Sequence, residues 1–599
     1  MTAQHLGLVA ALRQIYGFMS PARRRHLFWV LALMLLGAFA ELAAVASVMP
    51  FLALLSGSDR TYELGLFREI VAGLGFQSSN ARVVASATLF MTVVLLAAGV
   101  RLMLTWTTQR FAVRLGHEIA VEIQRRILHQ PYDFHTRHNS SEVLALLEKV
   151  QILVFGVLLQ LMYAVTAVVI IVVIVAALIR IDPFTASIAT LAFSALYLLI
   201  SSFAARQLMR NSTISGKAYS ERLKLLQESL GSIRDVIVDH SQAAYVEAFR
   251  LVDRRFAEAN ASSSFIGVAP RFAVEAAGMV VIAALALILS DREGGLIGAF
   301  PILGAMALGA LRLLPFLQQF YFGWTSLAGN RLVTTQVLDL LRLPLADAQT
   351  GSAPYASALG WQTRLRCDQV SFTYVAARRP ALRDVSISIP RGARVALVGK
   401  SGSGKSTLAD LLMGLLQPSE GSIMIDDVVL TPETRRAWQR GIAHVSQSIF
   451  LADTNIARNI AFGVPGQPTD AVRLAEAIRI AQLDEVIATL PQGIETVIGE
   501  GGVRLSGGQR QRIGIARAVY KDAALLVLDE ATNALDEATE AAVMGALDQY
   551  AANRTLIIIT HRPARVASCD LVIRLDGGRV VDIISNPKLA PGTNVRSGS

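Results

Sequence analysis

The strongest chemical signal in the sequence is a run of glycine, serine and lysine, GKSGSGKST, at residues 399–407. It fits the pattern G-x-x-x-x-G-K-[S/T], and it stands between the apolar segment RVALVG and the segment LADLLMGLL, which has helical character. Such a loop binds phosphate, because its glycines turn backbone N–H groups toward phosphate oxygens and the following helix adds partial positive charge. The predicted loop residues are Gly399, Lys400, Ser401, Gly402, Ser403, Gly404, Lys405, Ser406 and Thr407.

Two carboxylates further along the chain would complete a nucleotide site. Lys405 is expected to reach the β- and γ-phosphates, and Ser406 to bind Mg²⁺. The apolar segment ALLVLDE (524–530) predicts a buried strand that ends in Asp529 and Glu530. Asp529 suits the outer shell of Mg²⁺, and Glu530 could polarise an attacking water.

Two more segments could contribute residues to a nucleotide site. TLIIITH (555–561) predicts another buried strand, which ends in His561 where a γ-phosphate would lie. LSGGQRQR (505–512) precedes a plausible helix and presents a second glycine-rich helix N-terminus. Since the first loop already binds the phosphates, a second such loop is redundant within one site. We expect it to face a nucleotide bound by another copy of the chain.

The overall composition indicates a membrane protein. The 599 residues are 53% hydrophobic and 17% charged, which is too apolar for an ordinary soluble protein, and the length implies two or more domains. The net charge of +10 would suggest a nucleic-acid partner for a soluble protein, but in a membrane protein it is typical of cytoplasmic loops, and no nucleic acid is expected. The two cysteines, Cys367 and Cys569, are too few for a disulfide framework or a metal cluster.

Six apolar segments before about residue 325 are each long enough to cross about 30 Å of hydrocarbon as a helix. They cover residues 27–55, 83–106, 152–179, 183–205, 265–289 and 296–324. Basic residues gather before the first segment and in two long connections, which places both termini and these connections in the cytoplasm. The connections keep helical periodicity, so we expect helices that extend into the cytoplasm and turn near 130–141 and 227–232. Residues 61–75 predict a short helix, either in the outer interface or as a lid on the bundle.

The composition divides the chain into four parts. A transmembrane domain is predicted over 1–342, a linker over 343–363, a nucleotide-binding domain over 364–585 and a flexible tail over 586–599. The linker is rich in Pro, Gly, Ala and Ser, and beyond it short apolar strands alternate with helical segments. The predicted fold is therefore an all-α membrane domain of six helices fused to an α/β P-loop domain.

Taken in order, these motifs resemble those of an ATP-binding cassette (ABC) exporter of the half-transporter kind, with the type IV fold, over nearly the whole chain. The features that carry the resemblance are Tyr374, GKSGSGKST, Gln447, LSGGQ, Asp529–Glu530, NALD (533–536) and His561. Asn533 is one departure, since it stands where the family usually has serine.

The resemblance implies a role for each motif residue. Tyr374 would stack on adenine, and Gln447 would sense the γ-phosphate and Mg²⁺. Glu530 would be the general base, His561 would be a further catalytic residue, and Asp536 would link two sites. The signature residues Leu505, Ser506, Gly507, Gly508 and Gln509 would contact the partner's ATP. The implied cofactors are ATP and Mg²⁺, and the implied assembly is a homodimer that closes head to tail over two ATP molecules.

Three arginines inside the predicted spans are candidates for a substrate cavity, because ionisable groups at membrane depth are functional candidates by default. They are Arg101, Arg271 and Arg312. Doubled by symmetry, they would form a cationic cavity suited to an anionic head group such as pyrophosphate. Plainer readings stay open: Arg101 can reach the interface, Glu275 can neutralise Arg271, and Glu41 can pair with any arginine.

The short motifs Glu41 with VMPFL (48–52), and LRLLP (311–315), further resemble the subfamily that flips lipid-linked oligosaccharides. The hypothesis is ATP-driven export or flipping of an anionic amphiphile, such as a polyprenyl-pyrophosphate glycan. The expected partners are a second copy of the chain, the lipid bilayer and this lipid-like substrate. The expected place is the inner cell membrane, crossed several times, with the nucleotide-binding domain in the cytoplasm.

Other hypotheses remain at this point. Within the same fold, the protein could be a general lipid, drug or peptide exporter. From other classes, it could be a non-transporting ABC ATPase, which the six predicted spans disfavour. It could also be a membrane regulator that binds ATP without turnover, which the intact Glu530 and His561 disfavour.

Overall fold

The computed structural model describes residues 8–55, 79–137, 148–181, 183–290, 313–345, 359–375, 377–462 and 468–586. The chain forms two compact units. The first consists of Met1–Gln130 and Phe134–Ala348, and the second of Pro131–Asp133 and Gln349–Ser599.

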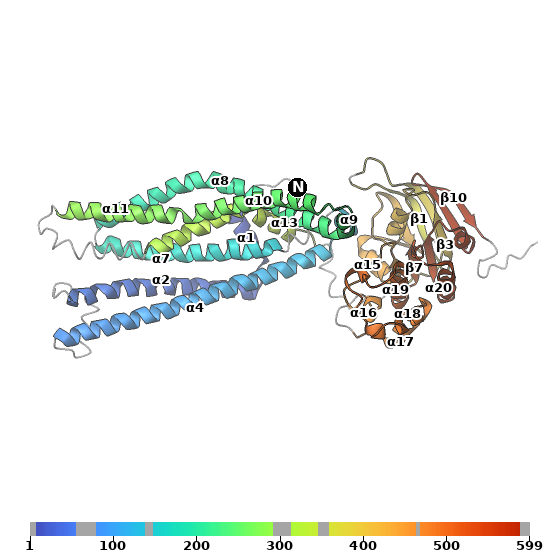
Figure 1. Ribbon diagram of the computed structural model, residues 1–599, viewed down its shortest axis with the longest axis horizontal. Coiled ribbons are helices and arrows are strands. Elements are labelled where there is room, and N and C mark those ends of the chain that lie inside the picture. Colours follow the sequence, from blue (N-terminus) through green and yellow to red (C-terminus); the bar gives the residue numbers. More distant parts are fainter. Residues whose placement is uncertain are drawn as a thin grey trace, which may run out of the picture. The chain divides into compact units, whose positions relative to one another are not determined.

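Long helices that lie alongside one another make up the first unit (Figure 1). They are α2 (Pro21–Leu55), α4 (Ser79–Leu128), α7 (Leu159–Ile181), α8 (Pro183–Gly231), α10 (Gln242–Val268), α11 (Pro270–Ser290) and a helix over 313–329. The shorter helices are α1 (Leu8–Phe18), α5 (Tyr132–Arg137), η2 (Ile152–Leu158), α9 (Ile233–Val238) and α13 (Arg331–Leu341). At about 1.5 Å per residue, the 50 residues of α4 extend far beyond the thickness of a hydrocarbon core.

The predicted spans lie on these helices wherever the structure describes them. One difference is the predicted span 265–289, which divides into α10 and α11 at Ala269 because Pro270 has no N–H to continue the helix. Within the part of the chain that the structure describes, three segments are long and apolar enough to cross a membrane by length and composition: Pro21–Ala44, Val83–Leu128 and Glu148–Ala177. The predicted helix at 61–75 and the predicted span up to residue 312 lie outside the described residues. The number of six spans stays a prediction.

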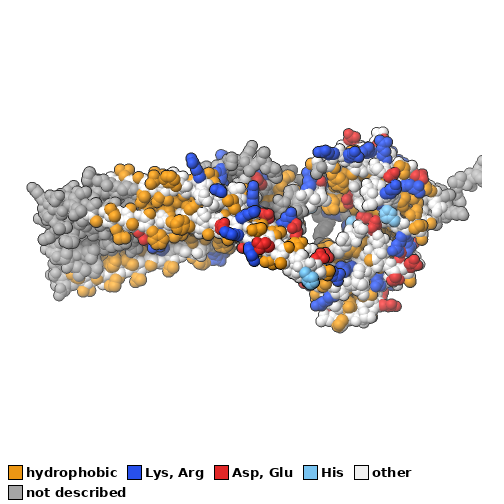
Figure 2. All heavy atoms as spheres, turned by 45° about the horizontal axis from the view of Figure 1, so that its top comes forward, with side chains coloured by type: hydrophobic (Ala, Val, Ile, Leu, Met, Phe, Trp, Pro, Cys, Tyr) orange, Lys and Arg blue, Asp and Glu red, His pale blue; other side chains and the backbone are white. Residues whose placement is uncertain are grey.

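The outer surface of the helical unit is apolar. Figure 2 shows hydrophobic side chains along its flank, while Lys and Arg gather toward one end. Phe28, Leu95 and Phe203 are 68%, 72% and 77% exposed. An apolar surface this extensive would be unfavourable in water, so it is the surface expected of helices that face lipid.

Two sheets form the second unit. The larger has the order β10-β9-β3-β8-β7-β6, and its neighbours run parallel except β10, which is antiparallel to β9. Its strands are β3 (Arg394–Val398), β6 (Ile442–Val445), β7 (Leu525–Asp529), β8 (Thr555–Ile559), β9 (Leu571–Asp576) and β10 (Arg579–Ser585). The smaller sheet is antiparallel, with β2 (Leu382–Pro390), β1 (Arg364–Phe372), β4 (Glu420–Ile425) and β5 (Val428–Val429) in that order. The strands predicted at 524–530 and 555–561 are β7 and β8, which lie side by side in the centre of the larger sheet.

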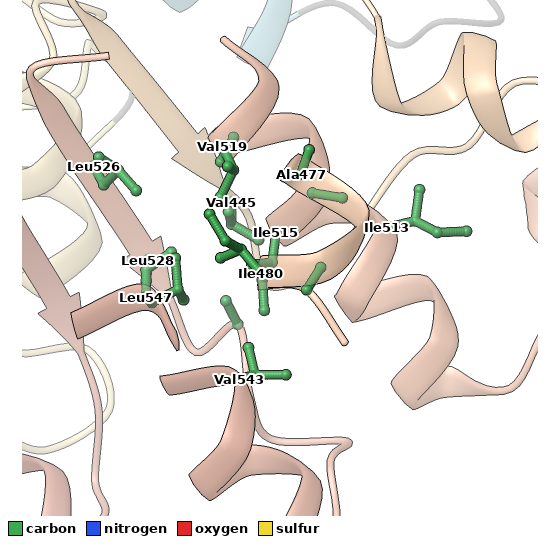
Figure 3. Packing of buried hydrophobic residues seen from close by; sticks show 14 of the residues in the cluster. Val445, Ala477, Ile480, Ile513, Ile515, Val519, Leu526, Leu528, Val543 and Leu547 are labelled. Atoms are coloured by element: carbon green, nitrogen blue, oxygen red, sulfur yellow. The ribbon is translucent and has the colours of Figure 1, made fainter. Parts of the chain in front are cut away.

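Helices pack around the two sheets and help to bury their apolar strands. They include α14 (Lys405–Leu412), α15 (Pro432–Arg440), α16 (Ile456–Ile460), α17 (Ala471–Ile480), α18 (Asp484–Ala488), α19 (Gly507–Tyr520), α20 (Glu537–Tyr550) and α21 (Pro563–Ala567). Figure 3 shows part of this core, in which Leu526 and Leu528 of β7 lie in one cluster with Ile515 and Val519 of α19 and Leu547 of α20. Full burial of each such side chain stabilises the fold by about 1.5–3 kcal/mol. The core therefore fixes the helix after the LSGGQ stretch against the strand that ends in Asp529.

Candidate functional site

The predicted phosphate loop connects the end of β3 to the start of α14. Gly399, Gly402 and Gly404 have φ values of +151°, +76° and +102°, which residues other than glycine rarely adopt. A Cβ atom on Gly399 would lie 2.2 Å from the carbonyl oxygen of Leu575, and one on Gly404 would lie 2.7 Å from Leu382 Cδ2. The backbone conformation thus favours glycine at all three positions, and the close approach of neighbouring strands adds to this at Gly399 and Gly404.

Replacing Gly399 with alanine should therefore weaken ATP binding. The new Cβ would push the loop away from Leu575 and would also be strained at the observed φ, so we expect the Kd for ATP to rise about tenfold or more. Isothermal titration calorimetry measures this change. Gly392 is a matched control, because its φ is +80° but a Cβ there meets nothing within 4 Å. Gly392→Ala should keep the affinity for ATP, and wild-type affinity in Gly399→Ala would contradict the prediction.

The side chain of Lys405 is hydrogen-bonded to the backbone of the phosphate loop. Its ammonium group donates to the carbonyl oxygens of Gly399, at 2.8 Å, and Lys400, at 3.0 Å, and the residue is only 7% exposed. The positive charge is therefore held within the curve of the loop that the sequence assigns to phosphate. Binding a triphosphate would exchange these carbonyl contacts for charge-assisted bonds to phosphate oxygens, which are stronger.

Asp529 lies at the end of β7 and accepts a hydrogen bond from Ser406. Burial raises the pKa of Asp529, the charge of Glu530 adds to this rise, and Ser406 and Lys405 oppose it. Burial and the charge of Asp529 also raise the pKa of Asp410 on α14 to about 6. A bound cation would stabilise the ionised form of both carboxylates. The hydroxyl of Ser406 and the carboxylate of Asp529 are hard oxygen ligands, which fit Mg²⁺.

Glu530 is held between three side chains from different parts of the chain. Its Oε2 accepts from Gln447 Nε2 at 2.8 Å and from Asn533 Nδ2 at 3.0 Å. Its Oε1 lies 3.7 Å from His561 Nε2. The predicted catalytic residues Gln447, Glu530 and His561 come together because β6, β7 and β8 are parallel neighbours, so the residues that follow them meet at one edge of the sheet.

No function was predicted for Asn533 from the sequence, and its hydrogen bond to Glu530 is seen only in the structure. The available signal was its departure from the serine usual in the family. Glu530 itself has a φ of +49°, a left-handed conformation that costs a non-glycine residue free energy and is common at functional sites.

Tyr374 follows β1 and lies next to the phosphate loop. Its hydroxyl is 3.2 Å from Thr407 Oγ1, and its ring meets the edge of Phe372 with the ring centroids 4.8 Å apart. The side chain is therefore anchored beside the start of α14. Its stacking on adenine remains a prediction.

The signature residues form the first turn of α19. Gln509 N donates to Ser506 Oγ at 3.2 Å and Ser506 N donates to Gln509 Oε1 at 2.9 Å, which is a capping box. Leu505 is buried, and Gly507 and Gly508 pack on Ala534, where a Cβ on Gly508 would lie 3.0 Å from the carbonyl oxygen.

The segment around Ala534 links this turn to the next helix. The Ala534 N–H donates to Gln511 Oε1 of α19 at 2.8 Å. Asp536 caps α20 by accepting from Thr539 N at 2.9 Å, and this bond lowers the pKa of the Asp536 carboxyl. The signature turn and Asp536 are thus placed together on one rigid surface of the domain.

The candidate substrate arginines have carboxylate partners where the structure describes them. Arg101 pairs with Glu41 across α4 and α2 at 3.1 Å, and Arg271 pairs with Glu275 on α11 at 2.6 Å. Arg312 lies outside the described residues. These contacts agree with the plainer interpretations that Glu41 pairs with an arginine and that Glu275 neutralises Arg271. A role for the arginines in substrate binding stays a prediction.

Arg101 and Glu41 line a cavity of about 70 Å³ within the helical unit. Thr105, Thr108 and Thr166 line it as well, together with apolar residues such as Leu104 and Phe316. The buried Thr108 hydroxyl has no hydrogen-bond partner among the described residues.

Known proteins resemble this chain in both the helical unit and the unit with the two sheets. Residues 48–290 match the family model for the ABC transporter transmembrane region, and residues 382–533 match the model for the ABC transporter. A solved structure of a bacterial Atm1-family ABC exporter with ATP bound has a TM-score of 0.75 and covers 94% of this chain and 96% of its own. At 24% sequence identity, this likeness shows the fold.

Curated relatives carry the name ATP-dependent lipid A-core flippase. The protein from Burkholderia orbicola (strain AU 1054) is 32% identical over 368 residues, which are 61% of this chain and 60% of the relative. Those from Burkholderia pseudomallei (strain 1710b) and Shewanella oneidensis (strain ATCC 700550 / JCM 31522 / CIP 106686 / LMG 19005 / NCIMB 14063 / MR-1) are each 42% identical over 41% of this chain, and the alignments cover 40% and 41% of those relatives. The matched part of this chain thus spans less than two thirds of each relative's length.

The transmembrane match and the apolar helices make this a membrane protein, with its nucleotide-binding domain in the cytoplasm. Both units that define an exporter are present on one chain, and both family models match in the expected order. The chain belongs to the ABC transporter family and has the layout of an exporter half-transporter.

Proposed function

We propose that the protein hydrolyses ATP in sites shared by two copies of the chain and uses the reaction to move a lipid-like substrate across the membrane. The observation that carries this proposal is the edge of the larger sheet, where Glu530 is in contact with Gln447 and close to His561. Asp529, bonded to Ser406, joins this edge to the phosphate loop. Phosphate-binding, cation-binding and proton-accepting groups are therefore adjacent, as phosphoryl transfer to water requires.

Each residue of this edge has a task in the proposed reaction. ATP is the proposed substrate, and a bound Mg²⁺ would supply positive charge to neutralise the transferred phosphoryl group. Lys405 would bind phosphate oxygens, while Ser406 and Asp529 would hold the cation. Glu530 accepts a proton from the attacking water at Oε1, since Oε2 already accepts two hydrogen bonds. His561, whose Nε2 lies 3.7 Å from Oε1, would contact the transferred phosphoryl group in this proposal.

The proposed assembly is a homodimer. Ser506 and Gln509 are hydrogen-bonded to each other, which fixes the N-terminus of α19 with its partial positive charge. We propose that Ser506 and Gly508 in this turn face the γ-phosphate of ATP bound to the phosphate loop of the partner subunit. Asp536, on the same surface, then lies at the interface between the two sites.

The proposed substrate is a lipid-like amphiphile, supported by the relatives named ATP-dependent lipid A-core flippase. An anionic head group, such as a pyrophosphate-linked oligosaccharide, is the finer proposal. Because Glu41 neutralises Arg101 and Glu275 neutralises Arg271, any preference for anions would depend on residues beyond these two pairs, with Arg312 as the first candidate. The head group is therefore the part of the proposal that experiment must decide first.

Reconstitution into liposomes tests the proposed function. A labelled pyrophosphate-linked glycolipid should move to the opposite leaflet when ATP is added, and a neutral glycolipid with the same tail should move more slowly. Liposomes with the Glu530→Gln variant should show no ATP-dependent movement. Quenching of the label by a membrane-impermeant reductant measures the fraction that has crossed.

The other hypotheses correspond to distinct outcomes of the same experiment. Equal movement of both glycolipids would support a lipid transporter without an anionic preference. ATP turnover with movement of a cationic dye, but of neither lipid, would overturn the lipid proposal in favour of a drug exporter. ATP binding without turnover would identify a membrane regulator.

A further inference from the structure

Asn533 is the place where this chain departs from the serine usual in the family, and the structure connects that departure to Glu530. Asn533 Nδ2 donates to Glu530 Oε2 at 3.0 Å, and Gln447 Nε2 donates to the same oxygen at 2.8 Å. An ionised carboxylate only accepts hydrogen bonds, so the amide nitrogen of Asn533, and not its oxygen, must face Glu530. Both donors lie on one carboxylate oxygen and leave the other, Oε1, toward His561.

The backbone around Asn533 holds its side chain in this position. Asn533 N donates to Glu530 O at 3.3 Å, and Asn533 O accepts from Arg562 Nη2 at 3.5 Å. On the other side, Glu530 N donates to Ile559 O of β8 at 3.1 Å. Because both backbones are fixed, a side chain one heavy atom shorter, such as serine, would not reach Oε2 from residue 533. The contact therefore depends on asparagine.

We propose that Asn533 is a positioning residue that holds the Glu530 carboxylate by Oε2, so that Oε1 stays free to accept the proton of the attacking water. Gln447 Nε2 is the second donor to Oε2 and shares this task. This inference rests on the proposed function, in which Glu530 is the general base.

Asn533→Ala tests the inference through the separation of kcat from KM. Loss of one hydrogen bond to a charged group should lower kcat for ATP hydrolysis about three- to tenfold. The KM for ATP should stay within about twofold, because Asn533 acts through Glu530 and not on the nucleotide. Asn553→Ala, at another exposed asparagine of the same domain, is the matched control and should keep the wild-type kcat.

A double-mutant cycle shows whether the effect passes through Glu530. In a Glu530→Gln background the residual rate should not fall further when Asn533→Ala is added, because no base remains to be positioned. An equal fold-loss in both backgrounds would overturn the inference.

Asn533→Asp gives a readout that a purely structural role would not move. It replaces a donor with a second carboxylate beside Glu530, and adjacent carboxylates resist ionisation. The acid limb of the plot of kcat against pH should therefore move up by about one pH unit, and that of Asn533→Ala by less.

The two levels of the proposal fail in different ways. If Glu530→Gln is strongly slowed while Asn533→Ala keeps the wild-type kcat and Asn533→Asp keeps the wild-type acid limb, only the role of Asn533 is overturned. If Glu530→Gln hydrolyses ATP normally, the proposed function loses its base and the inference falls with it. A melting temperature within error of wild type for each Asn533 variant, as expected for an exposed residue, excludes unfolding as the cause of a lower rate.

Discussion

Glu530→Gln should bind ATP about as well as the wild-type protein and hydrolyse it at least 10²–10⁴ times more slowly. Glutamine keeps the size of glutamate and a carbonyl oxygen that can accept from Asn533 and Gln447, so the geometry of the site is retained. Its amide cannot take the proton of the attacking water. Phosphate release gives the rate, and calorimetric titration with ATP gives the affinity.

The matched control is Glu476→Gln on α17, where an exposed glutamate lies away from the edge of the sheet that carries Glu530. This variant should keep the wild-type rate, which shows that loss of one negative charge from the domain is not the cause. Normal hydrolysis by Glu530→Gln would refute Glu530 as the base. Loss of ATP binding together with activity would instead point to a disturbed phosphate loop.

The parts of the site that follow directly from local sequence were predictable. β7 and β8 are continuous apolar runs, buried on both faces, so their ends at Asp529 and just before His561 could be located from composition alone. The rule that parallel strands present their carboxyl ends at one edge then predicts that Glu530 and His561 lie close together. The measured separation of 3.7 Å agrees with that reasoning.

The contact of Asn533 could not be predicted in the same way. It depends on the left-handed φ of Glu530 and on the tight turn between the two residues, which place the amide opposite Oε2. A single sequence indicates neither the turn type nor the rotamer. The departure from serine was visible, but its consequence required the coordinates of the neighbouring side chains.

The membrane arginines show the same division. Arg271 and Glu275 are four residues apart on a helix, so their pairing could be anticipated from spacing. Arg101 and Glu41 are far apart in the sequence, and their pairing depends on how α2 packs on α4. Composition predicts that these helices are apolar, but it does not fix which of their faces meet. The charge of a cavity is therefore less predictable from sequence than the phosphate loop is.

Mixing two inactive variants should restore ATP hydrolysis if the sites are shared between subunits. Lys405→Ala removes a phosphate ligand, and Ser506→Ala removes the signature hydroxyl, so each variant alone should lose most of its activity. In a mixed dimer, both changes fall in one site and the other site is intact. With random exchange of subunits, the activity should return to about a quarter of wild type, since half of the dimers are mixed and each has one working site.

As the control, each variant is taken alone through the same subunit-exchange procedure. Neither variant should then regain ATP hydrolysis. Strict coupling between the two sites could also keep a mixed dimer inactive, so a second measurement is needed. If the sites are shared, the rate per subunit of the wild-type protein must fall on dilution as dimers dissociate, because the phosphate loop then lacks the signature turn of a second subunit. A rate per subunit that stays constant down to concentrations at which the protein is monomeric, together with failure of the mixed dimer, would overturn the shared site.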